Sequence, residues 1–174
     1  MSQIPTAYRE VIDPLIAVAR QIVEGGEPLV PVAFAGNLES RHMQQVMLRA
    51  SSTQAKDESA ELVRRLAQEI DADFVFIIMD AWGLPPEKIS RYDEILEEYG
   101  SIGASPDRID IVAFTLETRH GTWVAQSEVK DGPPGGSEQT FDDPKLLLVP
   151  GAEGRFTGLL PEKEGGGPPP GVLH

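Results

Sequence analysis

The sequence predicts an α+β protein: a mostly antiparallel sheet of about five to six strands with helices packed against it. Two segments carry apolar residues at helical spacing. Residues 74–82 (FVFIIMDAW) are apolar without alternation, which is typical of a strand buried on both faces. Several shorter runs alternate as strands do, and turns rich in glycine and proline separate them.

Residues 13–26 carry the start and stop signals of a helix. Asp13 suits the N-cap, Pro14 suits the first helical position, and Gly25 suits a left-handed residue after the last turn. We expect residues 5–12 to form a preceding turn or short helix that Pro14 separates from this one.

Two strand-like runs follow. Residues 28–34 form a short apolar run, and Pro31, which lacks an N–H, favours a sheet edge or an irregularity there. Residues 42–50 alternate as a strand, with Met43 and Met47 on one face. We expect that face either to join the core or to meet a partner subunit.

The clearest helix lies within residues 52–72, where charged residues fill the side opposite an apolar stripe. Lys56 falls on this inward stripe near the first turn, where the helix dipole and the apolar neighbours both disfavour a cation. It is expected either to reach a carboxylate, with Asp80 and Glu117 as candidates, or to extend its ammonium group to water. The stripe consists of Ser59, Leu62, Val63, Leu66, Ala67 and Ile70.

Residues 74–82 end in an acid and a tryptophan. If the strands of Asp80 and Glu117 are neighbours with coincident ends, the two carboxylates can act as acid and base or bind a cation. Alternatively, each marks the point where its strand emerges into solvent. Trp82 and Trp123 are expected to be core or rim aromatics, or else stacking platforms for a ligand.

The second half of the chain is expected to form an acidic surface helix over residues 85–100 and a β-hairpin over residues 106–129. The hairpin turns at His120–Gly121, where a tight turn accounts for the histidine better than catalysis does. Two last strands are expected over residues 145–151 and, with a weaker pattern, 155–161.

The predicted organisation is a single domain over residues 1–160 and a flexible Gly/Pro-rich tail over residues 161–174. The order of elements, a helix, a strand pair, a helix and a strand meander, resembles that of profilin-like and roadblock-like folds. Two short motifs, Asp80-Ala81-Trp82 and Pro106-Asp107-Arg108, also resemble those of a group of small bacterial proteins. That group carries no assigned activity, so the resemblance implies a fold neighbourhood and no chemistry.

The composition limits the classes of function. A net charge of −13 and a pI near 4.6 give a surface that repels phosphate backbones, so we expect no nucleic-acid partner. Charges interrupt the apolar positions of residues 1–26, so we expect neither a signal peptide nor a membrane span. The cysteine-free composition excludes disulfides and thiolate chemistry and fits a reducing cytoplasm, which is the predicted location.

Motifs for cofactor and metal chemistry are missing from the sequence. No phosphate-binding loop, dinucleotide fingerprint or nucleophile elbow occurs, so we predict no cofactor. Glu39 precedes His42 by the spacing found in di-iron sites, but such sites need a second copy on a facing helix. We therefore predict no metal site.

Lys56, Asp80, Glu117 and Trp82 remain as candidate binding residues, with no residue assigned as catalytic. The favoured function is a non-catalytic, cytoplasmic binding or interaction module that binds a protein partner or associates with itself. The alternative is a small hydrolase-like enzyme that uses Asp80, Glu117 and Lys56 in one pocket, and dispersal of the three would favour the module. A third hypothesis is a phage or mobile-element accessory protein that acts by acidic mimicry.

Overall fold

The computed structural model describes residues 3–49, 51–132, 134–136, 138–150 and 159–160, which form three α-helices and a six-stranded antiparallel sheet. The helices are α1 (Thr6–Glu24), α2 (Thr53–Glu69) and α3 (Tyr92–Tyr99), with 3-10 turns η1 (Pro86–Arg91) and η2 (Ile102–Ala104). The strands are β1 (Val32–Gly36), β2 (Met43–Met47), β3 (Phe74–Gly83), β4 (Ile109–Thr118), β5 (Gly121–Glu128), β6 (Lys130–Asp131), β7 (Gln139–Thr140) and β8 (Leu147–Leu148).

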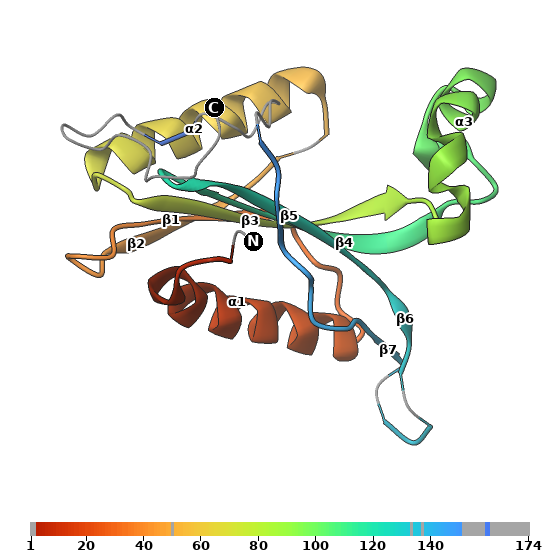
Figure 1. Ribbon diagram of the computed structural model, residues 1–174, viewed down its shortest axis with the longest axis horizontal. Coiled ribbons are helices and arrows are strands. Elements are labelled where there is room, and N and C mark those ends of the chain that lie inside the picture. The colour runs from red at the N-terminus through yellow and green to blue at the C-terminus, as the bar shows by residue number, and fades with distance from the viewer. Residues whose placement is uncertain (1–2, 50, 133, 137, 151–158, 161–174) are drawn as a thin grey trace.

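The main sheet has the strand order β2-β1-β3-β4-β5-β8, while β6 and β7 pair separately. Helix α1 lies across one face of the sheet and α2 across the other, as Figure 1 shows. The α+β class and the antiparallel sheet predicted from the sequence are therefore confirmed. The profilin-like order of elements is not confirmed.

Strand β3 is central, as its lack of alternation predicts, and it pairs with β1 on one side and β4 on the other. Phe74, Phe76 and Ile78 belong to the core under α1, whereas Val75 and Ile77 belong to the core under α2. All five are at most 3% exposed. An apolar strand of this kind is stable only between two covering layers, and the two helices provide them.

Helix α1 starts well before Asp13, so residues 5–12 are not a separate element and Pro14 lies inside the helix. The predicted helix start is wrong because the apolar stripe continues toward the N-terminus through the buried side chains of Tyr8 and Ile12. Burying such a side chain contributes about 1.5–3 kcal/mol, so the two together offset the ~3 kcal/mol that an interior proline costs.

The end of α1 also differs in detail. Gly25 caps the helix in a right-handed conformation (φ −79°), and its N–H donates to Gln21 O at 2.9 Å. The left-handed residue is the next one, Gly26, at φ +75°. The helix therefore ends at Glu24, and the left-handed residue lies one position later than predicted.

Strand β1 is internal, since it pairs with both β2 and β3, and the edge position predicted from Pro31 is wrong. Pro31 lies just before the first strand residue, Val32, where its missing N–H removes no hydrogen bond from the sheet. Its carbonyl still accepts from Leu48 N at 2.8 Å. The edge strand is β2 instead.

The hairpin of β4 and β5 turns at Arg119–His120, one residue earlier than predicted, and only Gly121 has a positive φ (+139°). The Thr118 hydroxyl closes the turn, because it accepts from His120 N at 2.9 Å and donates to Gly121 O at 3.0 Å. These two side-chain hydrogen bonds close the turn without the two left-handed residues that the sequence pattern suggests.

Residues 84–108 leave the sheet between β3 and β4 and carry η1, α3 and η2, and we name this segment the excursion. In Figure 1 the α3 helix stands beyond the end of the sheet. Ile95 is the buried residue of α3, whereas Ile89, Tyr92 and Tyr99 are exposed. The predicted helix over residues 85–100 is therefore split, with its first half in the 3-10 form.

Other parts of the prediction lie at the end of the chain. The strand expected over residues 145–151 is present as β8, which pairs with β5. Of the weaker strand over residues 155–161, only Leu159 and Leu160 are described, and the predicted tail over residues 161–174 lies outside the described residues. Within the described part of the chain, no helix is long and apolar enough to cross a membrane.

Burial of β3 on both faces makes a paired prediction. Phe76→Ala is expected to lower the free energy of unfolding by about 3–5 kcal/mol and Ile77→Ala by about 2–5 kcal/mol, because each leaves a cavity under a different helix. Leu147→Ala, at a side chain 67% exposed, is expected to change it by under ~0.5 kcal/mol. Urea unfolding followed by circular dichroism measures all three. If either β3 variant leaves the free energy of unfolding nearly unchanged, no helix covers the face of β3 that carries the substituted residue.

Candidate functional site

A pocket of about 510 Å³ opens where β3 leaves the sheet, near the C-terminal end of α1 and the N-terminal turn of α2. It brings together Lys56, Asp80 and Trp82, which are three of the four candidate binding residues. Its apolar wall and remaining polar groups come from Val23, Glu27, Pro28, Leu29, Ala81, Asp110, Ile111, Val112, Val129 and Gln139.

The sheet register places the acids of the pocket. Asp80 and Trp82 follow the buried Ile78 at intervals of two residues, so their side chains lie on the face that α1 covers. Trp82 pairs with Asp110 of β4, which adds a second aspartate to the same face. In the sequence IDIVAF, Asp110 lies between apolar residues, a pattern that indicates a strand. The sequence does not show that this strand pairs with β3.

Lys56 comes to this pocket from the helix on the opposite face of the sheet. Strand β1 begins opposite Ile78, so Asp80 lies beyond the first residue of β1. No residue of β1 therefore lies beside β3 at this point of the sheet. The half-buried Lys56 side chain therefore lines the same cavity as residues of α1. This position explains how a lysine is tolerated on the inward stripe of α2.

Three carboxylates and one ammonium group line the pocket: those of Glu27, Asp80, Asp110 and Lys56. None of these side chains forms an ion pair within 4.0 Å with another described residue. The described residues also contain no group of His, Asp and Glu side chains arranged to hold a metal ion. The pocket is thus a cavity lined by three acidic side chains and one basic side chain.

Trp82 forms the rim of the pocket and is 57% exposed. The excursion holds its indole ring: the Arg108 guanidinium lies 5.4 Å from the ring centroid, and Arg108 Nη1 donates to Gly103 O at 2.8 Å. A methyl group on Gly103 would come within 2.3 Å of the indole, so this close approach requires glycine. Trp82 is a rim aromatic with a fixed ring.

Glu117 does not join the pocket. It pairs with Val75, far along β4 from the residue opposite Asp80, and its side chain lies on the α2 face. Its carboxylate accepts from Leu159 N at 3.0 and 3.1 Å and from Leu160 N at 3.1 Å. Glu117 is 8% exposed and Leu159 is fully buried, so this carboxylate attaches a distant segment to the sheet.

A second polar cluster, which sequence reasoning missed, lies at the hairpin end of the sheet. Asp73 accepts from Leu38 N at 2.7 Å and forms an ion pair with Arg119, also at 2.7 Å. Burial raises the pKa of the nearby Tyr8 phenol, and the charge of Asp73 raises it further. No local pattern marks this cluster, because its members come from four separate segments of the chain.

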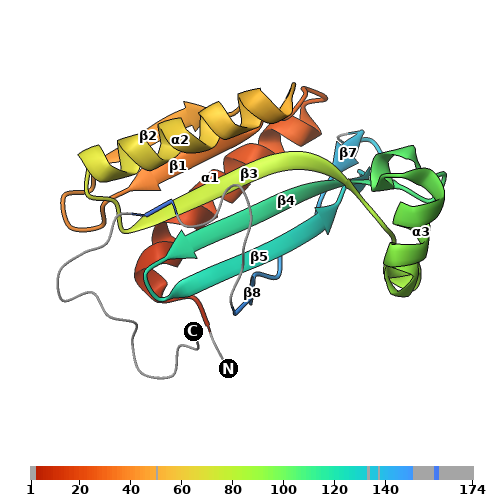
Figure 2. The same cartoon turned by 90° about the horizontal axis from the view of Figure 1, so that it is seen from above.

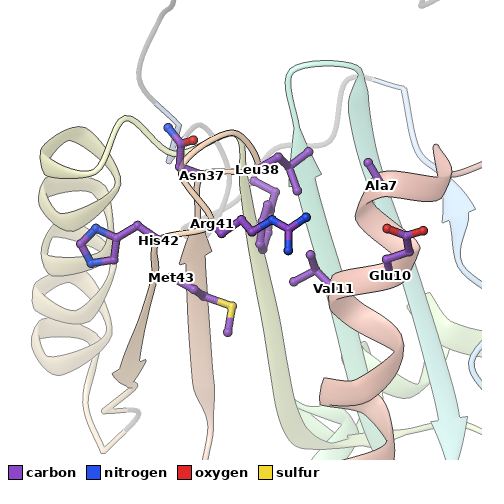
Figure 3. Close-up of a pocket in the computed structure, with 10 residues that line it drawn as sticks. Ala7, Glu10, Val11, Asn37, Leu38, Arg41, His42 and Met43 are labelled. Atoms are coloured by element: carbon purple, nitrogen blue, oxygen red, sulfur yellow. The ribbon is translucent and has the colours of Figure 1, made fainter.

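A second cavity, of about 550 Å³, separates α1 from the turn between β1 and β2. Figure 3 shows Arg41 extending across it toward Val11 of α1, while the imidazole of His42 points away from α1. His42 Nε2 lies 2.9 Å from the Gln44 side-chain nitrogen. Glu39 and His42 occupy an exposed turn and not facing helices.

Comparison of the chain with protein-family models, with curated protein sequences and with solved structures gives no match.

The Glu117 contact makes a prediction about stability. Glu117→Ala leaves the buried N–H of Leu159 and the half-buried N–H of Leu160 without their acceptor and is expected to lower the free energy of unfolding by about 2–3 kcal/mol. Glu117→Gln retains one acceptor oxygen and is expected to lose less than Glu117→Ala. Glu128→Gln, on the exposed face of the neighbouring strand, controls for the change in net charge. If Glu117→Ala has the same free energy of unfolding in urea as the wild type, the hydrogen bonds from Glu117 to Leu159 contribute nothing to stability.

Proposed function

We propose that this chain is a non-catalytic, cytoplasmic binding module that takes a positively charged side chain of a partner protein into the pocket of Lys56, Asp80 and Trp82. The observation that supports this best is the convergence of Asp80, Asp110 and an exposed indole around one cavity. Carboxylates attract a cation, and the face of an indole adds a cation–π contribution of about 0.5–2 kcal/mol.

The shape of the lining favours a long side chain such as arginine or lysine. The apolar part of the wall, formed by residues such as Leu29, Val112 and Val129, suits a methylene stem, while the acids at the mouth suit its charged end. Arg108 over Trp82 shows that this indole already accepts a guanidinium from within the chain. The net charge of −13 also favours approach of a basic partner over a nucleic acid.

Lys56 acts as a competitor in this proposal. Its ammonium group lines the cavity without a described ion-pair partner, so it offsets part of the negative charge when the pocket is empty. A ligand cation must displace it or share the carboxylates with it. Lys56 thereby lowers the affinity of the pocket for cations. It selects ligands whose other contacts with the pocket outweigh the repulsion between the two positive charges.

The enzyme hypothesis, which needs Asp80, Glu117 and Lys56 in one pocket, receives less support. Glu117 lies on the other face of the sheet with both oxygens engaged by backbone amides. The remaining pair of Lys56 and Asp80 has no placed nucleophile among the residues that line the cavity. We therefore propose no second function.

The proposal predicts that a capped arginine tripeptide binds at the pocket. In a ¹H–¹⁵N spectrum the indole signal of Trp82 is expected to shift, while that of Trp123, which is 2% exposed, stays in place as an internal reference. Trp82→Phe assigns the two signals. The same tripeptide with glutamate in place of arginine is expected to leave both unchanged, and equal shifts with the two peptides would contradict the proposal.

Charge variants give the expected direction of affinity. Asp80→Asn and Asp110→Asn should each weaken binding of the arginine tripeptide about fivefold, and Lys56→Met should strengthen it by about threefold or more. Glu10→Gln removes an exposed charge outside the pocket and controls for net charge. Unchanged titration curves for all three pocket variants would exclude this site.

A further inference from the structure

Strand β2 exposes two large apolar side chains, and α1, α2 and the segment before β1 each expose one. Val18 of α1, Val30 before β1, Met43 and Met47 of β2, and Leu62 of α2 are each 42–52% exposed. We call these residues the β2-edge surface. The same register that places Phe34 opposite Gln45 puts Met43 and Met47 on the face that α1 covers only in part. The edge strand therefore exposes two methionines on one of its faces.

Among the described residues, no strand pairs with the outer side of β2. Asn37 N donates to His42 O, and Leu48 N donates to Pro31 O, both at 2.8 Å. In an antiparallel pair the residues alternate between those bonded to the partner and those directed away from it. Met43, Gln45 and Met47 therefore direct their N–H and C=O groups away from β1, toward the open edge of the sheet.

The edge strand carries no charge, although a quarter of the chain is charged. The sequence of β2, MQQVM, has none of the lysines or prolines with which natural sheets block edge pairing. A net charge of −13 would make two copies repel one another over most of their surface. This uncharged strand is the place where that repulsion is weakest.

We propose that β2 pairs with β2 of a second copy of this chain, antiparallel and centred on Gln45. Met43 then lies opposite Met47 of the partner subunit, and both strands satisfy their outward N–H and C=O groups. The pairing keeps each methionine on the same face of the joined sheet, as the alternation of strand side chains requires. The strand is self-complementary under a two-fold axis, which is the symmetry of most homodimers.

The position of α2 fits the same axis. Helix α2 contacts both β1 and β2, and Figure 2 shows it lying over these two strands. A two-fold axis at the edge therefore places the two α2 helices about two strand spacings apart, or ~10 Å. Packed helices lie about 8–10 Å apart, so the helices meet at contact distance.

The residues on the outer flank of α2 suit this contact. Ser59 marks the side of α2 that faces the end of β2, since it hydrogen-bonds Arg49 N at 2.8 Å. The exposed Leu62 follows on that side by helical spacing, and so does Leu66, which packs partly against the core under α2. In the dimer these leucines are covered by those of the partner subunit.

This interface is separate from the pocket, since no residue of β2 lines the cavity of Asp80 and Lys56. The dimer proposal and the pocket proposal can therefore be contradicted independently of one another. Asp80→Asn is expected to leave the subunit count unchanged, and a change at β2 is expected to leave the shift of the Trp82 indole signal intact.

The chain has no cysteine, so single cysteines test the register directly. Gln45→Cys places two cysteines in a hydrogen-bonded antiparallel pair with Cα atoms about 5.5 Å apart, within disulfide reach. A disulfide-linked dimer is expected under mild oxidation. Gln44→Cys is the matched control, because residue 44 lies opposite residue 46 of the other subunit and two such cysteines stand about 7–8 Å apart or more. Equal cross-linking of the two variants would overturn the register.

Light scattering after size exclusion tests the dimer itself. Wild type is expected to be a dimer at protein concentrations on the order of 100 μM, and Gln45→Lys is expected to raise the dissociation constant at least tenfold through two facing charges. Gln45 is exposed, so the variant should keep the wild-type circular dichroism spectrum. A monomeric wild type, or a Gln45→Lys protein that dimerises equally well, would overturn the proposal.

Discussion

The molecule is organised by the burial of β3 on both of its faces. Phe74, Phe76 and Ile78 need one covering layer, and Val75 and Ile77 need another, because each fully buried side chain of this size contributes about 1.5–3 kcal/mol only when water is removed from it. Helices α1 and α2 supply the two layers from opposite sides of the sheet. Every other feature is placed relative to this three-layer arrangement.

The end of that burial defines the candidate site. Asp80 is the first residue of β3 that is exposed, and it lies beyond the start of β1. There the strand leaves the shared core, and a lysine from one covering helix meets residues of the other around a single cavity. Trp82, near the end of β3, forms the rim of this cavity, and Arg108 of the excursion lies over its indole ring. The acidic pocket is thus a consequence of a long central strand that extends beyond its shorter neighbour β1.

Local patterns in the sequence were sufficient for the features that depend on local physics. The helix over α2, the two-sided burial of β3 and the hairpin of β4 and β5 follow from periodicity, and Lys56, whose charge departs from the pattern of its stripe, lines the pocket. Long-range packing decided the rest: burial of Tyr8 carries α1 through Pro14, and the partner of Glu117 lies at Leu159, forty-two residues away in the chain. Periodicity cannot supply the register that separates Glu117 from Asp80, since that register depends on which strands pair.

Hydrogen exchange of the backbone amides tests the three-layer arrangement most directly. The amides of Phe74 to Ile78 are paired on both sides of β3 and covered above and below, so their exchange should require global unfolding and should report the full free energy of unfolding. The amide of Trp82, close to the end of β3, should exchange through local opening, which requires less free energy than global unfolding. Exchange of the Phe74–Ile78 amides as fast as that of exposed strand ends would contradict the account, because β3 would then lie at the periphery.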